Sequence, residues 1–285
     1  MSDFKVLVFG ADCWIGKRFV KKVNETSGYI KAIPGNTEIR TLEDVRDEMD
    51  RVKPDAVLNA VSPPSNHPDI IWDSNVRVPM IISDVCQERG CSFTHFSTGR
   101  IFNQNKISPL FGFDEEDIPN PADHYLKTVF EGEQLLLNEE SLILRLGTPF
   151  DDSSNENSLI VKLIEALKSG RSFSDDEVSV ICVDDLIWIT LRLIETRMTG
   201  IYHIANPTAV SYKLITNRIK ELGIVDLAPG NFSSTQDELN SGCVLDIMKL
   251  EKELKIIGRP IQFSWQALER YLRRYKSYLL EAGAA

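Results

Sequence analysis

The chain has 285 residues, 42% of them hydrophobic and 26% charged, which are ordinary globular values and exclude extensive disorder. Its net charge of −10 and pI near 5.0 argue against nucleic acid or an anionic membrane as a partner. The 5 cysteines form no Cys-x-x-Cys pair and the 4 histidines no ligand cluster, so we expect no metal site and a reducing, cytoplasmic compartment.

The first apolar run, residues 6–9, ends at a glycine turn. We expect no signal peptide before it and no membrane-spanning segment after it. A glycine turn between a strand and a helix lets backbone N–H groups approach a pyrophosphate, which the helix N-terminus also attracts. Cys13 occupies the middle glycine position, so a plain strand-to-helix turn is the alternative interpretation. The residues of this turn expected to contact a cofactor are Gly10, Asp12, Cys13, Trp14, Ile15 and Gly16.

Strands and helices alternate through the first half of the chain. Besides the first strand, strands are expected at 29–33, 56–61, 92–97 and 142–146, and helices at 16–23, 42–52, 75–89 and 125–138. This order predicts an α/β fold, a Rossmann-type doubly wound parallel sheet with helices on both faces. Ligands of such sheets bind beyond the carboxyl ends of the strands. The residues expected at those ends are Gly10, Ala60, Thr98 and Thr148.

The pattern becomes less regular after residue 150. A polar loop over 151–157 precedes an expected helix at 159–169, a strand and helix within 178–193, a strand at 200–206 and a last helix at 265–280. We expect residues 1–150 to form a Rossmann domain that binds NAD(P). Residues 151–285 are expected to form a smaller α/β substrate-binding lobe, some segments of which pack back on the Rossmann domain.

Several segments together carry a family resemblance. They are residues 9–16, 97–102, 113–119, 200–207 and 210–211, in order and spacing with Asn59, Ala60, Asn75 and Tyr125. The chain resembles the extended short-chain dehydrogenases/reductases, and among them the dTDP-4-dehydrorhamnose reductase group with its bifunctional nucleotide-rhamnose 3,5-epimerase/4-reductases. The resemblance implies NADPH-dependent reduction of a nucleotide-linked 4-keto-6-deoxyhexose, such as dTDP- or UDP-4-dehydrorhamnose, in deoxysugar biosynthesis.

The same resemblance implies roles for single residues. Tyr125 matches the tyrosine that protonates the keto oxygen, Thr98 the hydroxyl that binds this oxygen, and Asn75 the residue that braces the proton relay. Donors fixed in this way stabilise the charge of a developing alkoxide. Packing of an aromatic ring and a strand end are the alternative interpretations of Tyr125 and Thr98. The resemblance also implies cofactor contacts for Asn59, Ala60, Val61, Thr148 and Pro149, and substrate contacts for Ser97, Arg100 and Lys162.

Two positions depart from the pattern of the family. The family tyrosine is followed four residues later by a lysine on the same helix face, and here that residue is Val129. Without the cation, a phenol with a pKa of about 10 donates its proton less readily, which costs on the order of 10²–10⁴ in rate. Arg100 stands where the relatives have cysteine or tyrosine. An arginine suits a diphosphate or a keto oxygen but is a poor proton shuttle, so we expect weak or no epimerase activity.

The second expected strand lacks the acidic residue that is typical of NAD-binding enzymes. Lys31, Asn36 and Arg40 are candidates for contacts with a 2′-phosphate, which favours NADPH, and surface charges beside a turn are the alternative. Elsewhere, His95 is expected as a hydrogen-bonded core histidine and Glu133 on a solvated helix face.

Two functions stay open from the residues alone. Tyr125, Thr98 and Asn75 favour the reductase, which is the function we expect. Cys13 and Val129 favour a catalytically impaired nucleotide-binding or regulatory protein on the same scaffold, a route that the regulatory subunit of methionine adenosyltransferase represents. The expected partner is a nucleotide-sugar substrate, and the resemblance implies a homodimer through the helices at 75–89 and 125–138.

Overall fold

The computed structural model describes residues 3–35, 38–102, 112–137, 140–225, 243–257 and 261–283, so Asn36 lies outside the described residues. The chain divides into two compact units whose segments alternate along the sequence. The first unit comprises Met1–Phe102, Ile118–Arg145 and Ile187–Tyr202, and the second Asn103–Asp117, Leu146–Leu186 and His203–Ala285. The assignment of cofactor binding to residues 1–150 and of substrate binding to residues 151–285 stays a prediction.

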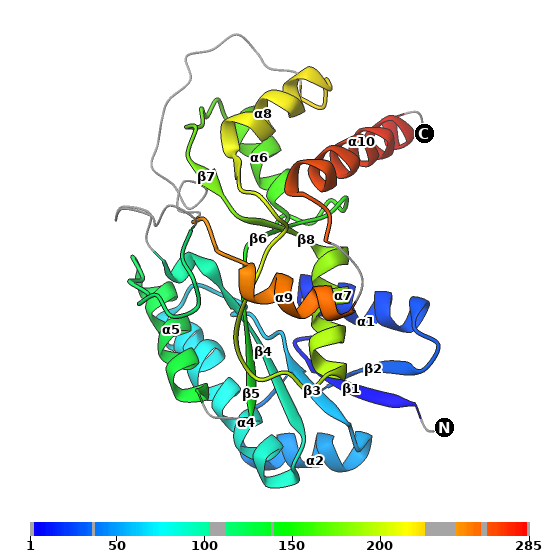
Figure 1. Cartoon of the computed structure of the whole chain (residues 1–285), viewed down its shortest axis with the longest axis vertical. Helices are drawn as coiled ribbons and strands as arrows, with labels where there is room; N and C mark the ends of the chain where they lie inside the picture. Colours follow the sequence, from blue (N-terminus) through cyan, green and yellow to red (C-terminus); the bar gives the residue numbers. More distant parts are fainter. Residues whose placement is uncertain are drawn as a thin grey trace. The chain divides into compact units, whose positions relative to one another are not determined.

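A six-stranded sheet in the order β2-β1-β3-β4-β5-β9 organises the first unit (Figure 1). Its strands are β1 (Phe4–Phe9), β2 (Ile30–Pro34), β3 (Ala56–Asn59), β4 (Ser92–Thr98), β5 (Ser141–Leu146) and β9 (Gly200–Ile204). The first four pair in parallel, and Phe9, Asn59 and His95 stand level in neighbouring strands. The predicted α/β Rossmann-type fold is confirmed. β3 is shorter than the expected strand at 56–61, because the chain turns away after Asn59.

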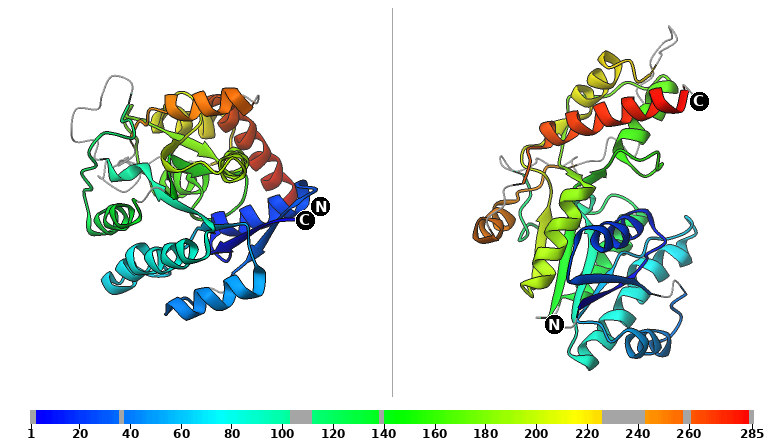
Figure 2. Two further views of the ribbon diagram at one scale, coloured as in Figure 1. Left: turned by 60° about the horizontal axis from the view of Figure 1, so that its bottom comes forward. Right: turned by 90° about the vertical axis from the view of Figure 1, so that its right-hand side faces the viewer.

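Helices cover both faces of this sheet (Figure 2). On one face lie α2 (Leu42–Val52), α4 (Val78–Arg89) and α5 (His124–Leu136). They bury apolar side chains such as Val45, Ile82 and Leu136 against Leu7 and Ile143 of the strands. On the other face lie α1 (Trp14–Thr26) and the part of α7 (Val183–Glu195) that belongs to the first unit. Apolar residues at helical spacing on one face of each helix, together with strands such as β3 and β5 that are buried along their whole length, account for this layering.

The expected helix at 75–89 is the last part of a longer helical segment. α3 (Pro68–Trp72) leads into a π-helical turn, Asp73–Arg77, which continues directly into α4. Such turns insert one extra residue into a helix and are frequent at functional sites. Asn75, one of the residues expected to be catalytic, lies on this turn and is only 8% exposed.

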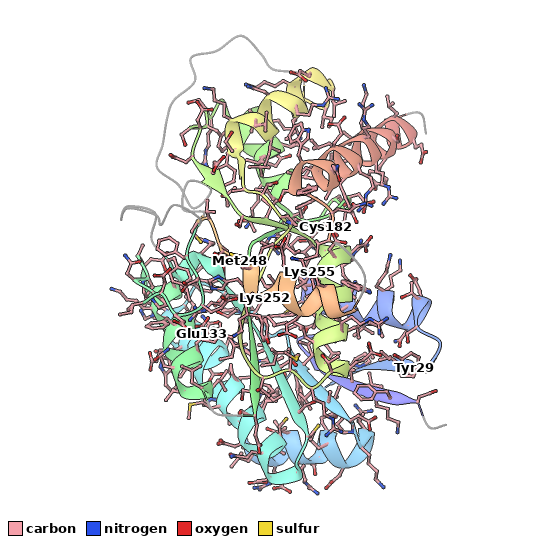
Figure 3. All side chains as sticks on the ribbon, in the orientation of Figure 1. Tyr29, Glu133, Cys182, Met248, Lys252 and Lys255 are labelled. Carbon is pink, nitrogen blue, oxygen red and sulfur yellow. The ribbon has the colours of Figure 1, made fainter. Side chains whose placement is uncertain are left out.

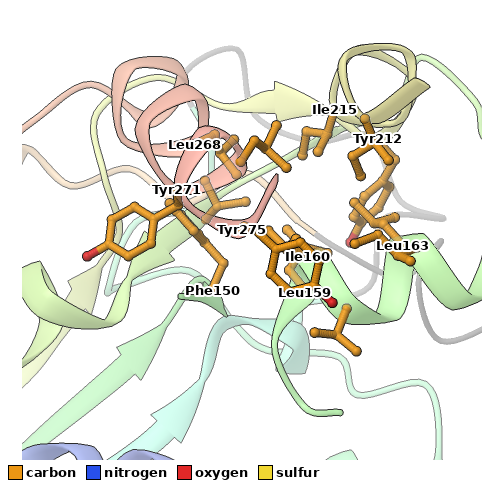
Figure 4. Close-up of a cluster of buried hydrophobic side chains, with 14 of the residues drawn as sticks. Phe150, Leu159, Ile160, Leu163, Tyr212, Ile215, Leu268, Tyr271 and Tyr275 are labelled. Atoms are coloured by element: carbon orange, nitrogen blue, oxygen red, sulfur yellow. The ribbon is translucent and has the colours of Figure 1, made fainter. Parts of the chain in front are cut away.

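The second unit has a hydrophobic core of its own (Figure 4). Its strands are β6 (Thr148–Phe150), β7 (Glu177–Val178), β8 (Val180–Cys182) and β10 (Val210–Ser211), paired as β6 with β8 and β7 with β10. Its helices are α6 (Leu159–Lys168), α8 (Tyr212–Glu221), α9 (Met248–Ile257) and α10 (Ser264–Gly283). Tyr271 packs edge-on against Phe150, 5.6 Å between ring centroids. We did not predict α8 and α9, because each is 10 residues long and polar on most of its surface.

Helix α5 packs against the π-helical turn with no room for a side chain at Gly132. A Cβ added to Gly132 would lie 2.0 Å from the carbonyl oxygen of Asn75. Glycine is therefore required here by the close approach of two backbones rather than by its own dihedral angles.

We predict that Gly132→Ala lowers the free energy of unfolding by about 2–3 kcal/mol, because α5 must move away from the turn that carries Asn75. The measurement is chemical denaturation. Gly28→Ala is the matched control, since a Cβ at Gly28 meets no heavy atom within 4 Å. Equal stability of the two variants would contradict this packing.

Candidate active site

The glycine turn after β1 is shaped by contacts between backbones. Gly10 has a φ of +78°, and a Cβ there would lie 2.5 Å from the carbonyl carbon and oxygen of Ala60. A Cβ at Gly16 would lie 2.1 Å from the carbonyl oxygen of Gly10. The two glycines thus hold the start of α1 against the ends of β1 and β3. Two of the three glycine positions of a dinucleotide-binding turn are thus filled by glycine, and the third is Cys13.

Cys13, at the middle position of the turn, is the N-cap residue of α1. Its backbone N–H donates to the carbonyl of Gly10 at 3.0 Å. Burial raises the pKa of the half-buried thiol, against a smaller opposite effect of a hydrogen bond from the backbone of Ser62. The thiol is therefore held protonated beside Ser62. Of the other turn residues, Asp12 is exposed and Trp14 and Ile15 are half-buried.

A buried polar pair fixes the loop after β3. The Nδ2 of Asn59 lies 3.0 Å from the Nδ1 of His95, while its Oδ1 accepts from the backbone N–H of Val61 at 3.1 Å. An amide NH₂ can only donate, so Nδ1 of His95 must be the acceptor and its ring must be neutral. Burial lowers the pKa of His95 to about 4, in agreement with this state. The expected hydrogen-bonded core histidine is confirmed, and it orients the amide that shapes the loop at Ala60 and Val61.

The end of β4 presents the hydroxyl of Thr98. Its Oγ1 accepts a hydrogen bond from the backbone N–H of Arg100 at 3.2 Å, in the short turn Gly99–Ile101. Because the oxygen serves as the acceptor in this bond, the hydroxyl hydrogen is left for a further acceptor. Thr98 can therefore donate to a ligand oxygen beyond the strand end.

The first turn of α5 carries Tyr125, which is 36% exposed. Asp123 is the N-cap residue of this helix, and its carboxylate accepts from the backbone N–H of Leu126 at 2.8 Å. The hydroxyl of Thr128 donates to the carbonyl of Tyr125 at 2.8 Å and accepts from the Nδ2 of Asn75 at 3.0 Å. The amide of Asn75 thus ties the π-helical turn to the turn of α5 that carries Tyr125.

The position of the missing family lysine is buried. Val129 is only 6% exposed, whereas Lys127 lies on the exposed side of α5. A residue two positions along a helix points about 160° away from the first, so the ammonium of Lys127 is directed to solvent. Lys127 therefore does not replace the cation that the family places at residue 129.

Glu133 is buried, contrary to the sequence-based expectation, and it binds Ser97 of β4. Glu133 is 0% exposed, so the expectation of a solvated helix face was wrong for this residue. The hydroxyl of Ser97 donates to Glu133, which also pairs with Arg145 of β5. A substrate contact of Ser97 stays a prediction, and its hydroxyl has a protein partner. One signal was available: Glu133 is four residues after buried Val129 and so shares the face of α5 that turns inward.

The remaining residues with expected roles lie on three elements. Lys31 is half-buried on β2, and exposed Arg40 forms an ion pair with Glu38 at 3.1 Å. In the second unit, Thr148 and Pro149 are in β6, where the backbone N–H of Thr148 donates to the carbonyl of Ser179 at 2.8 Å. Lys162 is half-buried in α6. The roles of these residues toward cofactor or substrate stay predictions.

Two kinds of feature are absent from the described residues, a metal-binding cluster and a membrane-spanning helix. Across the described ranges, no three or more His, Cys, Asp or Glu side chains gather where they could hold a metal ion. Within the same ranges, no helix has the length and apolar character that crossing a membrane requires.

The sheet order, the glycine turn and the tyrosine at the start of α5 define a Rossmann protein of the extended short-chain dehydrogenase/reductase type. Residues 4–256 match the family described as RmlD substrate binding domain, and the chain belongs to this family. The predicted resemblance to the dTDP-4-dehydrorhamnose reductase group is thereby confirmed.

Similar proteins include sugar-nucleotide enzymes of plants and bacteria. The chain is 29% identical over 235 residues to the bifunctional dTDP-4-dehydrorhamnose 3,5-epimerase/dTDP-4-dehydrorhamnose reductase of Arabidopsis thaliana, covering 77% of this chain and 76% of that protein. It is 26% identical to a trifunctional UDP-glucose 4,6-dehydratase/epimerase/reductase of the same plant, covering 88% of this chain but 40% of that protein. The fold matches that of a dTDP-4-dehydrorhamnose reductase from Bacillus anthracis in complex with NADP, with a TM-score of 0.75, 19% identity and coverage of 95% of this chain and 98% of that one.

We predict a pH dependence of stability that originates at His95. The folded protein lowers the pKa of His95 from its ordinary value of 6.5 to about 4. Its contribution to stability is therefore fully present above pH 6.5 and is lost as the pH falls toward 4, by roughly 3 kcal/mol.

Denaturation of wild type and His95→Gln between these pH values measures this contribution. The glutamine carbonyl still accepts from Asn59 but does not titrate, so the variant is expected to lose less stability on acidification. His67→Gln, at a side chain that is 64% exposed, is the control. Parallel pH profiles of wild type and His95→Gln would show that the pair with Asn59 does not depend on a neutral ring.

Proposed function

We propose that this protein is an NADPH-dependent reductase of a nucleotide-linked 4-keto-6-deoxyhexose, with dTDP- or UDP-4-dehydrorhamnose as the substrate type. The observation that carries the proposal is the hydrogen-bonded connection from Asn75 through Thr128 to the backbone of Tyr125. It fixes the backbone that carries the expected proton donor, in a chain that belongs to the RmlD family. The reductases among its relatives support the choice of substrate.

The residues of the first unit fit a dinucleotide. Gly10 and Gly16 let the start of α1 lie against the ends of β1 and β3, and the N-terminus of α1 brings partial positive charge to this end of the sheet. Ala60 and Val61 follow the loop that Asn59 and His95 hold in place. NADPH supplies a hydride when it is bound. Lys31 and Arg40 are proposed to favour it over NADH.

Two hydroxyl groups of the first unit then serve the keto oxygen of the sugar. Thr98 donates a hydrogen bond to this oxygen with the hydrogen that its contact to Arg100 leaves available. The phenol of Tyr125 gives its proton to the same oxygen as negative charge develops on it. The exposure of Tyr125 is consistent with access to a ligand. Fixed donors of this kind lower the barrier because they need no reorganisation during the reaction.

Without the family lysine, the phenolate of Tyr125 forms beside the buried, uncharged Val129. Proton donation is therefore expected to limit the rate. We propose that Arg100, two residues after Thr98, provides positive charge to the substrate, as a contact to its diphosphate or its keto oxygen. Epimerase activity is not part of the proposal, since an arginine at this position does not shuttle protons. A homodimer through α4 and α5 and substrate contacts of Lys162 stay predictions.

We predict that Tyr125→Phe lowers kcat at least 100-fold, on the order of a lost general acid. Val129→Lys is predicted to raise kcat about tenfold, because an ammonium one helical turn from Tyr125 stabilises the phenolate. The measurement is oxidation of NADPH with dTDP- and UDP-4-keto-6-deoxysugars. Val129→Met is the control, since it adds length without charge.

The outcome separates the reductase from the second function. Turnover by wild type that disappears in Tyr125→Phe supports the reductase. A wild type that binds NADPH without turnover, with activity appearing only in Val129→Lys, would instead identify a catalytically impaired nucleotide-binding protein.

A further inference from the structure

A charged pair is completely buried beneath the ends of β4 and β5. The side chains of Glu133 and Arg145 are 0% and 2% exposed. The guanidinium donates through Nη2 to Oε2 at 2.8 Å and through Nε to the same oxygen at 3.0 Å. The hydroxyl of Ser97 donates to the other carboxylate oxygen, Oε1. The three residues come from α5, β5 and β4, and Glu133 is labelled at its place on α5 in Figure 3.

A buried ion pair of this kind adds little net stability to the folded protein. Taking two charges out of water costs about as much as their mutual attraction returns, and apolar residues of similar size are often as stabilising. Within the described residues, Nη1 of Arg145 is buried and makes no hydrogen bond. The guanidinium also stacks on the ring of Phe102, 5.3 Å from its centroid. The network provides a fixed geometry between α5, β5 and β4, which apolar packing does not provide.

The elements that it joins carry the two hydroxyl groups of the proposed reaction. Ser97 immediately precedes Thr98, so a bond to Ser97 fixes the last residues of β4. Glu133 lies on the helix that carries Tyr125, about two turns further along. Both hydroxyls must meet a single keto oxygen, and an error of about 1 Å in such an arrangement costs roughly 100-fold in rate.

We propose that Ser97, Glu133 and Arg145 are positioning residues that set the placement of Thr98 relative to Tyr125. This inference rests on the proposed reductase function for its effect on turnover. Its structural part stands separately: the carboxylate of Glu133 holds β4 through Ser97 and β5 through Arg145, while its own helix carries Tyr125. None of the three residues contacts the keto oxygen in this proposal.

The test uses two variants of the whole chain. Ser97→Ala removes the hydroxyl and leaves the ion pair intact. Glu133→Leu/Arg145→Met replaces the pair by apolar side chains of similar size, so that no buried charge is left unpaired. The matched controls are Ser83→Ala, at a buried serine of α4, and Glu269→Leu/Arg218→Met, at the two-bond ion pair between α8 and α10.

We expect kcat to fall about tenfold in Ser97→Ala and about 100-fold in the double variant, with the KM for NADPH changed less than twofold. The controls are expected to keep kcat. A folded double variant with wild-type kcat, or parallel losses in kcat and cofactor affinity, would overturn the positioning role. If the double variant does not fold, Ser97→Ala decides by the same criteria.

A second readout does not need turnover. The amide of Arg100 donates to the hydroxyl of Thr98, so its hydrogen exchange reports directly on the position of this hydroxyl. We expect its exchange to become at least tenfold faster in Ser97→Ala and unchanged in Ser83→Ala. Unchanged exchange in Ser97→Ala would overturn the inference. A wild type without turnover refutes the proposed function alone, because the exchange result still decides on the network.

Discussion

The contact between the backbones of Gly10, Gly16 and Ala60 is the constraint on which the first unit depends. Three chain segments meet there with no side chain between them: the end of β1, the start of α1 and the loop after β3. A side chain at Gly10 or Gly16 would collide with these backbone atoms. The start of α1 is thereby held at the carboxyl end of the sheet, where we propose that the dinucleotide binds.

Near this end of the sheet, the polar side chains that support the proposed site are hydrogen-bonded to other groups of the protein. The side-chain amides of Asn59 and Asn75 bind protein groups: Asn59 binds His95, and Asn75 binds Thr128. The carboxylate of Glu133 is likewise used on its neighbours. Three separate contacts therefore fix α5, namely its cap at Asp123, the bond of Asn75 and the buried ion pair. A rigid support of this kind is what a tyrosine requires when it works without a neighbouring cation, because geometry then supplies what electrostatics does not.

The two departures from the family pattern both change where positive charge lies in the proposed site. Val129 removes a positive charge beside Tyr125, and Arg100 brings one to the turn after Thr98. Since the backbone of Arg100 also orients the hydroxyl of Thr98, this residue is tied to the strand end that meets the substrate. In the proposed reductase, the charge on the substrate side of the site replaces the charge on the tyrosine side.

Local patterns in the sequence predicted the sheet, most of its helices and the glycine turn, because period, glycines and chain order are visible within about 15 residues. The bonds that complete the site join residues far apart in the sequence. Asn59 and His95 are 36 residues apart, as are Ser97 and Glu133. No local pattern reports such pairing. Glu133 was misjudged because charge usually marks the solvent face of a helix. Its register with Val129 indicated the opposite, and the interleaving of the two units has no local signal at all.

The most direct test of the central claim follows the hydride itself. A single turnover with NADPH deuterated at the transferable position and dTDP- or UDP-4-dehydrorhamnose is analysed by mass spectrometry and NMR of the sugar product. A reductase of the proposed kind places one deuterium at carbon 4 of the hexose. A protein that binds NADPH and the nucleotide sugar but leaves the sugar without deuterium would contradict the claim that this protein is a reductase.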